Sequence, residues 1–378
     1  MASSPSIRVP FLSLRPGDDR PAIDAAIARV IDRGWFILGP ELQAFEQELA
    51  TASGTADAVG VGTGTDALSL ILRGLGIGPG DEVITTPLSA AYSALAIMAA
   101  EARPVFADID PSRLTIDPRA IEAAITPRTA AIMPVHLYGQ PADMPAILAI
   151  AERHGLAVIE DACQAHLATC GGRPVGTMGA AGALSFYPTK NLGALGDAGA
   201  VLTNDAALAG RIRRLRNGGQ SSRYHHDEFG VNSRLDEMQA AILRVRLARL
   251  PAWTAQRRAL AARYRAGLPP IVTAAAAAGQ SLVVPAEHDA GHVYHLFPVL
   301  SGDRDGLKTR LEANGIETLI HYPVPIPRQP AVASEEPADC PVANRICGEL
   351  LSLPLFPDLP EAAVTTVLEA LAASVSSP

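Results

Sequence analysis

A lysine in an unusual setting is the strongest chemical feature of the sequence. Lys190 follows the run SFYPT and precedes NLGALGDAGA, so its neighbourhood is small, glycine-rich and mostly apolar. Burial lowers the pKa of a lysine and leaves its amine free to attack a carbonyl carbon. An exposed loop lysine is the alternative, which the strand-like run before Lys190 disfavours. The pattern therefore predicts a buried nucleophile.

Three further groups suit an anionic ligand that contains a ring. GTGTD, at residues 62–66, joins a strand-like run to a helical pattern, where backbone N–H groups and the helix dipole favour a phosphate. A tight strand-to-helix turn explains GTGTD equally well. Asp161 follows the strand-like LAVI and can pair with a protonated ring nitrogen, with helix capping as the alternative. Gln164 can donate to a phenolic oxygen or pack beside it, and Ser185 can add a hydroxyl to the phosphate.

A fourth polar segment, at residues 224–237, reads YHHDEFGVNSRLDE. Its HHD could suggest a metal, but no other His, Cys or Asp cluster stands at ligand spacing, so the sequence predicts no metal site. The alternative interpretation is a polar loop before a helix, with Asn232 or Ser233 as the N-cap.

Alternating apolar runs and amphipathic stretches between residues 55 and 205 must position these groups. Such alternation predicts an α/β fold with a mostly parallel sheet covered by helices. Helices are expected over 118–124 and 144–154. The expected strands are 57–62, the run VITT after residue 82, 104–110, 129–139, 156–161 and 182–187.

The length of 378 residues favours a large domain and a smaller one. A helix is expected over 233–250, ending at Pro251, followed by a charged helix and a loop around the alanine run 274–278. We therefore expect a large domain over 1–251 and a smaller one over 252–378.

Composition and sequence pattern argue against several classes of protein. The formal net charge of −8 argues against a nucleic-acid surface. The four cysteines form no CxxC pair and are expected to be reduced. The N-terminus lacks a signal-peptide pattern, and the longest apolar run is too short to span a bilayer. A cytoplasmic protein without a membrane or nucleic-acid partner is expected.

The segments GTGTDAL, EDACQA, SFYPTKNLGALGDAGA and NSRLDEMQAAIL arrive in one order, together with VPFLSL, GWFILGPELQAFE, PVHLYGQPADM and HYPVP. This ordered set resembles the DegT/DnrJ/EryC1/StrS family of sugar aminotransferases over nearly the whole chain. The resemblance implies the α/β fold of fold-type I aminotransferases, with a mostly parallel central sheet and a smaller C-terminal α+β domain. It also implies a homodimer with active sites at the subunit interface.

The resemblance implies a pyridoxal 5′-phosphate (PLP) cofactor, carried as a Schiff base on Lys190. Asp161 is then expected at the pyridinium nitrogen and Gln164 near the phenolic oxygen. One position departs from the family, because Ala90 stands where an aromatic residue usually stacks on the cofactor ring. Either Tyr92 compensates by a local shift or the stacking is absent. The remaining expected contacts are Gly64, Thr65 and Ser185 with the phosphate, Asn232 with the phosphate from the other subunit, and Tyr92, His225 and His321 with the sugar nucleotide.

The implied reaction moves an amino group from glutamate to a nucleotide-linked ketosugar, as in deoxysugar biosynthesis. YHHDEFGVNSRLDE and HLYGQPADM look more like the 3-ketosugar branch, which favours a dTDP-3-keto-6-deoxyhexose, with a 4-ketosugar as the alternative. A PLP-dependent dehydratase is disfavoured, because such relatives carry histidine where Lys190 stands. A non-catalytic regulator is disfavoured by the intact set Asp161, Gln164, Ser185 and Lys190.

Overall fold

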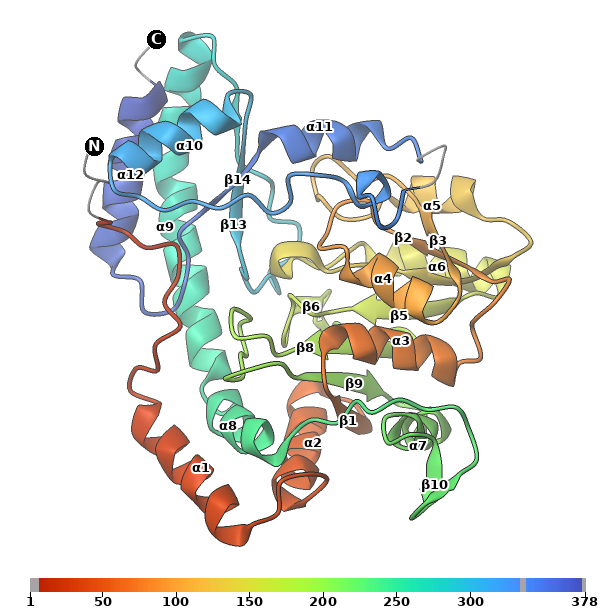
Figure 1. Ribbon diagram of the computed structural model, residues 1–378. Helices are drawn as coiled ribbons and strands as arrows, with labels where there is room; N and C mark the ends of the chain where they lie inside the picture. The colour runs from red at the N-terminus through yellow and green to blue at the C-terminus, as the bar shows by residue number, and fades with distance from the viewer. Residues whose placement is uncertain (1–6, 334–337, 376–378) are drawn as a thin grey trace.

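A seven-stranded sheet lies at the centre of the computed structural model, which describes residues 7–333 and 338–375 (Figure 1). The strand order is β1-β9-β8-β5-β4-β2-β3. β9 runs opposite to the other six strands of this sheet, so the prediction of a mostly parallel sheet is confirmed. The strands are β1 (Asp57–Val61), β2 (Glu82–Thr85), β3 (Arg103–Phe106), β4 (Thr129–Met133), β5 (Ala157–Asp161), β8 (Ala181–Ser185) and β9 (Gly199–Thr203).

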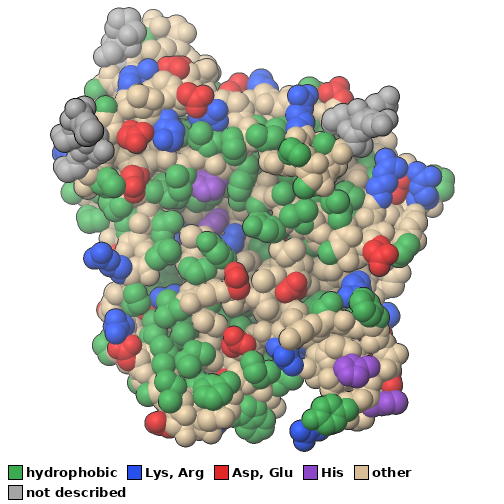
Figure 2. All heavy atoms as spheres, in the orientation of Figure 1, with side chains coloured by type: hydrophobic (Ala, Val, Ile, Leu, Met, Phe, Trp, Pro, Cys, Tyr) green, Lys and Arg blue, Asp and Glu red, His purple; other side chains and the backbone are tan. Residues whose placement is uncertain are grey.

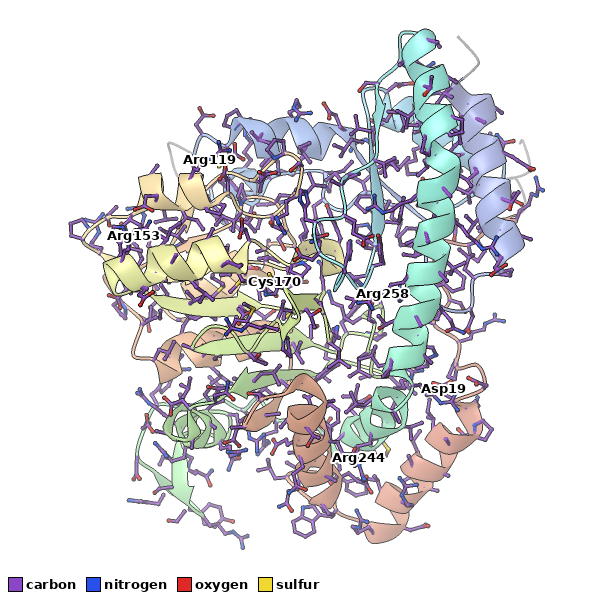
Figure 3. The ribbon with its side chains drawn as sticks, turned by 180° about the vertical axis from the view of Figure 1, so that it is seen from behind. Asp19, Arg119, Arg153, Cys170, Arg244 and Arg258 are labelled. Atoms are coloured by element: carbon purple, nitrogen blue, oxygen red, sulfur yellow. The ribbon has the colours of Figure 1, made fainter. Side chains whose placement is uncertain are left out.

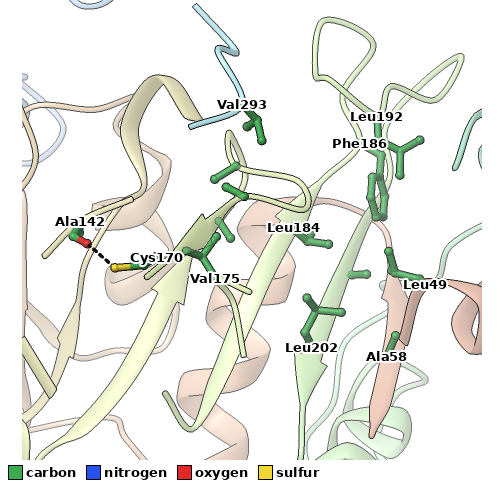
Figure 4. Close-up of a cluster of buried hydrophobic side chains, with 14 of the residues drawn as sticks. Leu49, Ala58, Ala142, Cys170, Val175, Leu184, Phe186, Leu192, Leu202 and Val293 are labelled. Carbon is green, nitrogen blue, oxygen red and sulfur yellow. Dashed lines mark hydrogen bonds between the residues drawn. The ribbon is translucent and has the colours of Figure 1, made fainter. Parts of the chain in front are cut away.

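Helices cover both faces of this sheet. One apolar layer joins the sheet to α3 (Gly64–Gly74), α4 (Tyr92–Ala99) and α7 (Ala206–Leu215). The opposite layer contains side chains of α2 (Pro40–Ser53), α5 (Pro118–Ala124), α6 (Met144–His154) and α8 (Glu237–Leu247). Figure 4 shows part of this second layer, where Leu49, Leu184 and Leu202 lie among the strands. Both faces are thus buried, as a mostly parallel sheet requires.

The helix expected over 233–250 is wrong at both ends. α8 begins at Glu237, because the Ser233 hydroxyl binds the N–H of Gly62 (3.0 Å) instead of capping a helix, and Asp236 is the N-cap residue. Neither Asn232 nor Ser233 is therefore the N-cap. A new helix, α9 (Leu250–Ala277), starts before Pro251, where proline is tolerated in the first turn. It runs through most of the alanine run, so the loop expected at 274–278 is also wrong.

The C-terminal part has its own apolar core. In this core a three-stranded antiparallel sheet packs with α9 and two further helices, so the α+β character expected of this part is present. The predicted boundary at 251/252 falls in the first turn of α9 and stays a prediction. The elements are β12 (Leu282–Val283), β13 (Phe297–Ser301), β14 (Leu350–Leu353), α10 (Arg304–Ala313), α11 (Pro341–Glu349) and α12 (Glu361–Val375).

The N-terminal segment belongs to both parts of the molecule. Val9 forms a parallel bridge with Ile316 and is buried in the C-terminal core, whereas α1 (Arg20–Arg33) packs on α8. Among residues 7–333 and 338–375, no helix has the length and apolarity to cross a membrane. The remaining short elements are η1 (Leu137–Gly139), β6 (Thr169–Cys170), β7 (Arg173–Pro174), β10 (Gln220–Ser222), β11 (His225–His226) and η2 (Ile326–Arg328).

Candidate active site

Lys190 lies in the loop after β8, which two backbone hydrogen bonds shape. The N–H of Lys190 donates to the carbonyl of Tyr187 (2.8 Å), and the N–H of Ala194 donates to that of Phe186 (2.7 Å). The lysine side chain is half-buried. Burial lowers the pKa of its amine, and nearby Cys163 and Asp161 act in the opposite direction. A larger fraction of the amine is therefore unprotonated, and this is the form that attacks a carbonyl.

Asp161 is the last residue of β5 and is buried. The parallel register pairs Asp161 with Ala183 of β8, which brings the carboxylate to the end of the sheet where the lysine loop begins. The Ser93 hydroxyl, from the first turn of α4, donates to Asp161 Oδ2 (2.7 Å). The N–H of Cys163 donates to Oδ1 (3.2 Å). Charged hydrogen bonds of this kind hold the carboxylate in one orientation. Ser93 was not predicted from the sequence, because one serine in an apolar run carries no signal.

The turn before α3 has the properties of a phosphate site. Thr63 is the N-cap, and its hydroxyl oxygen accepts the N–H of Asp66 (3.0 Å). A Cβ on Gly64 would lie 2.7 Å from Ser185 Cβ and 2.9 Å from Cys163 Sγ, so only glycine fits. The structure thus brings Gly64, Ser185 and the neighbouring Thr65 together. A helix N-terminus beside a serine hydroxyl fits the phosphate of PLP.

Gln164 connects two segments that the sequence separates widely. Its side-chain carbonyl accepts the N–H of Tyr138 (2.8 Å), and its amide donates to the Tyr322 hydroxyl (3.1 Å). The next residue back, His321, lies between Phe11 and the C-terminal sheet: its ring stacks on Phe11 (centroids 5.6 Å apart) and its Nδ1 contacts the Ser352 hydroxyl (3.0 Å). His321 therefore lies in the same region as Gln164, and its contact with the sugar nucleotide stays a prediction. Tyr322 was missed, although it stands in the HYPVP segment.

Three histidines near Lys190 have lowered pKa values. Burial is the main cause in each case, and the positive charge of Lys190 adds to it. The pKa falls to about 3 for His166 and to about 4 for His321, and lies well below the usual value for His295. These rings are neutral at physiological pH, so they can accept or donate hydrogen bonds without adding charge. Sequence reasoning missed His166 and His295. The first follows Gln164 by two residues, and the second has no local signal.

Other predicted residues are not brought to Lys190 within this chain. The His225 side chain is 72% exposed on the β10–β11 hairpin, with its Nε2 3.0 Å from Asp227 Oδ1. Asn232 is exposed and forms a bridge with Asn217. Tyr92 is 62% exposed at the start of α4, next to the Ser93 that binds Asp161. Within the described ranges, no group of three His, Cys, Asp or Glu side chains could hold a metal ion.

A cavity of about 200 Å³ opens beside the lysine loop. Its lining includes Lys190, Asn191, His295 and His321, together with residues of the N-terminal segment between Phe11 and Asp19. Figure 2 shows the molecular face with a hollow between the two parts of the molecule, in which histidine and basic atoms are visible. A small molecule entering this cavity would lie against Lys190.

Known proteins resemble this chain over nearly its whole length. A dTDP-3-amino-3,4,6-trideoxy-alpha-D-glucose transaminase of Streptomyces venezuelae is 50% identical over 368 residues, which cover 96% of this chain and 95% of that protein. The structure of DesV from Streptomyces venezuelae in complex with a ketimine intermediate has a TM-score of 0.94 and 47% identity, covering 99% of this chain and 100% of that one. The structure of NtdA from Bacillus subtilis with bound cofactor PMP has a TM-score of 0.90 and 33% identity, covering 98% and 85%.

The fold and the site, read with these relatives, define a PLP-dependent aminotransferase. Residues 18–372 match the model of the DegT/DnrJ/EryC1/StrS aminotransferase family. The chain belongs to that family, so the resemblance drawn from its ordered motifs is confirmed.

Proposed function

We propose that this aminotransferase moves the amino group of glutamate to the 3-keto carbon of a dTDP-linked 6-deoxyhexose. The observation that carries the proposal is the convergence of the Lys190 amine, the buried Asp161 and the glycine turn at Gly64 at one end of the sheet. The full-length similarity to a transaminase named for a dTDP-3-amino sugar supports the sugar and the position of amination.

The residues fit PLP, which supplies an electron sink for the carbanion when bound. Lys190 would hold it covalently, and its Nζ would then move a proton at the α-carbon of the donor. Asp161 would keep the ring nitrogen protonated, with Ser93 fixing the carboxylate. Gln164 would lie near the phenolic oxygen. The phosphate would be bound by Gly64, Thr65 and Ser185, with Asn232 from the other subunit, and Tyr92, His225 and His321 would border the sugar nucleotide.

The substrate assignment is tested by incubating the holoenzyme with glutamate and a purified dTDP-3-keto-6-deoxyhexose and following 2-oxoglutarate release. Turnover supports the proposal, and turnover with 4-keto substrates alone would replace it by the 4-ketosugar alternative. Lys190→Ala should lose the absorbance of the covalently bound cofactor and all turnover, because it removes the nucleophile. A Lys190→Ala variant that keeps wild-type turnover would overturn the role of this residue.

The proposal includes a cytoplasmic homodimer that shares its active sites. Large apolar side chains are exposed around the lysine loop and α1, including Tyr187, Leu195, Trp35 and Phe36, and exposed apolar patches favour association. Asn232 is exposed, while its neighbour Ser233 is buried against the glycine turn of its own chain. The Asn232 side chain can therefore contact a partner subunit.

Subunit mixing tests the sharing directly. Lys190→Ala and Asn232→Ala homodimers are expected to be impaired separately. After mixing and exchange, each heterodimer of a two-fold enzyme holds one intact site, so activity should recover to about a quarter of the wild-type value. A monomer in sedimentation, or no recovery although heterodimers form, would contradict shared sites.

A further inference from the structure

Three arginine side chains are buried in the described part of the chain, and one of them differs from the other two. Arg216 forms an ion pair with Glu46 (2.5 Å), and Arg246 forms one with Asp19 (3.0 Å). Arg257, which is 6% exposed, has no carboxylate within ion-pair distance among the described residues. A buried charge is strongly unfavourable unless an opposite charge and hydrogen bonds compensate it. Arg257 therefore lacks the anion that its burial calls for.

The hydrogen bonds of Arg257 satisfy only part of its guanidinium group. Nη1 donates to the carbonyls of Tyr294 (3.2 Å), His295 (3.3 Å) and Leu355 (3.0 Å). Nε is enclosed and has no partner. Burial lowers the pKa of Arg257 to about 10, so the group is still charged at neutral pH. The three carbonyl groups hold the guanidinium group in one orientation without neutralising its charge. Its remaining N–H donors can therefore bind an anion.

Arg257 and Lys190 line the same cavity of about 200 Å³. Two aspartates of its lining are already neutralised, since Asp19 is paired with Arg246 and Asp18 with Arg249. Asp19, labelled in Figure 3, lies where α1 begins, next to α8 and α9. Arg15 and Asp358 complete the charged lining, with one charge of each sign. Among the arginines of this lining, Arg246 is paired with Asp19 and Arg15 is exposed, so Arg257 is the buried arginine without an ion-pair partner within residues 7–333 and 338–375.

We propose that Arg257 binds a carboxylate of the amino donor while the donor's nitrogen reacts beside Lys190. This inference rests on the proposed aminotransferase function and adds the donor subsite to it. Every α-amino acid carries a carboxylate, and an arginine fork matches its geometry. The cavity is smaller than the roughly 300–1,000 Å³ typical of drug-sized ligands, so it suits an amino acid rather than a complete nucleotide sugar.

The test separates the two half-reactions. In the first, holoenzyme is mixed with glutamate alone, and the change in cofactor absorbance and the release of 2-oxoglutarate are followed. In the second, apoenzyme loaded with pyridoxamine phosphate receives only the dTDP-ketosugar. Arg257→Gln keeps an N–H donor for the carbonyls but loses the charge. It should raise the half-saturating glutamate concentration about ten- to a hundredfold, the usual effect of losing a charge-assisted hydrogen bond. The half-saturating ketosugar concentration should stay unchanged.

The matched control is Arg258→Gln, one residue along the same helix. Arg258 donates to the His292 carbonyl (2.9 Å) but does not line the cavity, and Figure 3 shows it on α9. This variant should leave both half-reactions unchanged. If Arg257→Gln fails to fold, Arg257→Lys keeps a charge without the fork and should still raise the half-saturating glutamate concentration selectively.

Two results would overturn the donor subsite: unchanged glutamate dependence in a folded Arg257 variant, or an equal loss for glutamate and ketosugar. A wild-type enzyme that accepts no amino donor would instead contradict the proposed function. A wild-type enzyme that prefers another amino acid leaves the Arg257 test intact, with that donor in place of glutamate.

Discussion

A single methyl group at Gly64 tests whether the turn before α3 binds the cofactor phosphate. In Gly64→Ala the new Cβ would lie 2.7 Å from Ser185 Cβ and 2.9 Å from Cys163 Sγ. Carbon atoms pack best at about 3.5–4.0 Å, so the start of α3 and the end of β8 must separate by about 0.8 Å or more. Overpacking of this size costs about 1–3 kcal/mol of stability. It also moves the N–H groups of the turn away from the serine hydroxyl.

The expected result is weaker cofactor binding. Loss of one charge-assisted hydrogen bond to the phosphate costs about 1.5–3 kcal/mol, which weakens PLP binding about ten- to a hundredfold. Apoenzyme is titrated with PLP and, separately, with pyridoxal, which lacks the phosphate. The variant should lose affinity for PLP much more than for pyridoxal.

The control is Gly210→Ala in α7, where a new Cβ meets nothing within 4 Å. Alanine favours a helix over glycine by about 1 kcal/mol, so this variant should be slightly more stable and bind PLP normally. If Gly64→Ala binds PLP as tightly as the wild type, the phosphate lies elsewhere and the reasoning fails.

Two further expectations concern the framework behind the site. Glu160 is fully buried and accepts hydrogen bonds from His136 and three backbone N–H groups. Glu160→Gln should lose two of these bonds, which lowers the free energy of unfolding measured in urea by about 3–6 kcal/mol. The control Glu122→Gln, at an exposed position, should leave the urea midpoint unchanged. An unchanged midpoint for Glu160→Gln would contradict this network. Burial lowers the pKa of His166 and His292 to about 3. The unfolded chain therefore binds more protons below about pH 6.5, and each ring should cost about 2 kcal/mol of stability at pH 5. Replacing either residue by glutamine should reduce the loss of stability on acidification. An unaltered dependence of stability on pH would refute this expectation.

The sequence predicted the sheet well because most of its strands are buried on both faces and read as continuous apolar runs, whereas the edge strand β3 is only partly buried. β9 was missed, since the glycines before it resemble a loop even though all five of its residues are buried. The start of α8 was misplaced for a different reason. Ser233 has the chemistry of an N-cap, but a tertiary contact with Gly62 takes its hydroxyl. Local capping rules do not include such distant competitors.

The candidate site was predictable where one short segment carries the chemistry, as at Lys190 and at Asp161 with Gln164. It was not predictable where the fold alone creates the contact. Ser93 reaches Asp161 from 68 residues away. The missing anion of Arg257 could not be predicted from the sequence either, because the sequence has many arginines, and only the fold shows that this one is buried without a carboxylate partner among the described residues.

The contacts of the N-terminal segment indicate when during folding the cavity is completed. The N–H of Val9 donates to the Gly315 carbonyl (3.1 Å), and the N–H of Glu317 donates to the Val9 carbonyl (3.0 Å). During synthesis, residues 7–12 must therefore wait until about residue 317 has left the ribosome before they find their partners. Contacts so distant in sequence form late, because a very long loop must close first. The wall between Phe11 and Asp19 is thus completed after the sheet that carries Lys190, and a truncated chain would leave the lysine open to water.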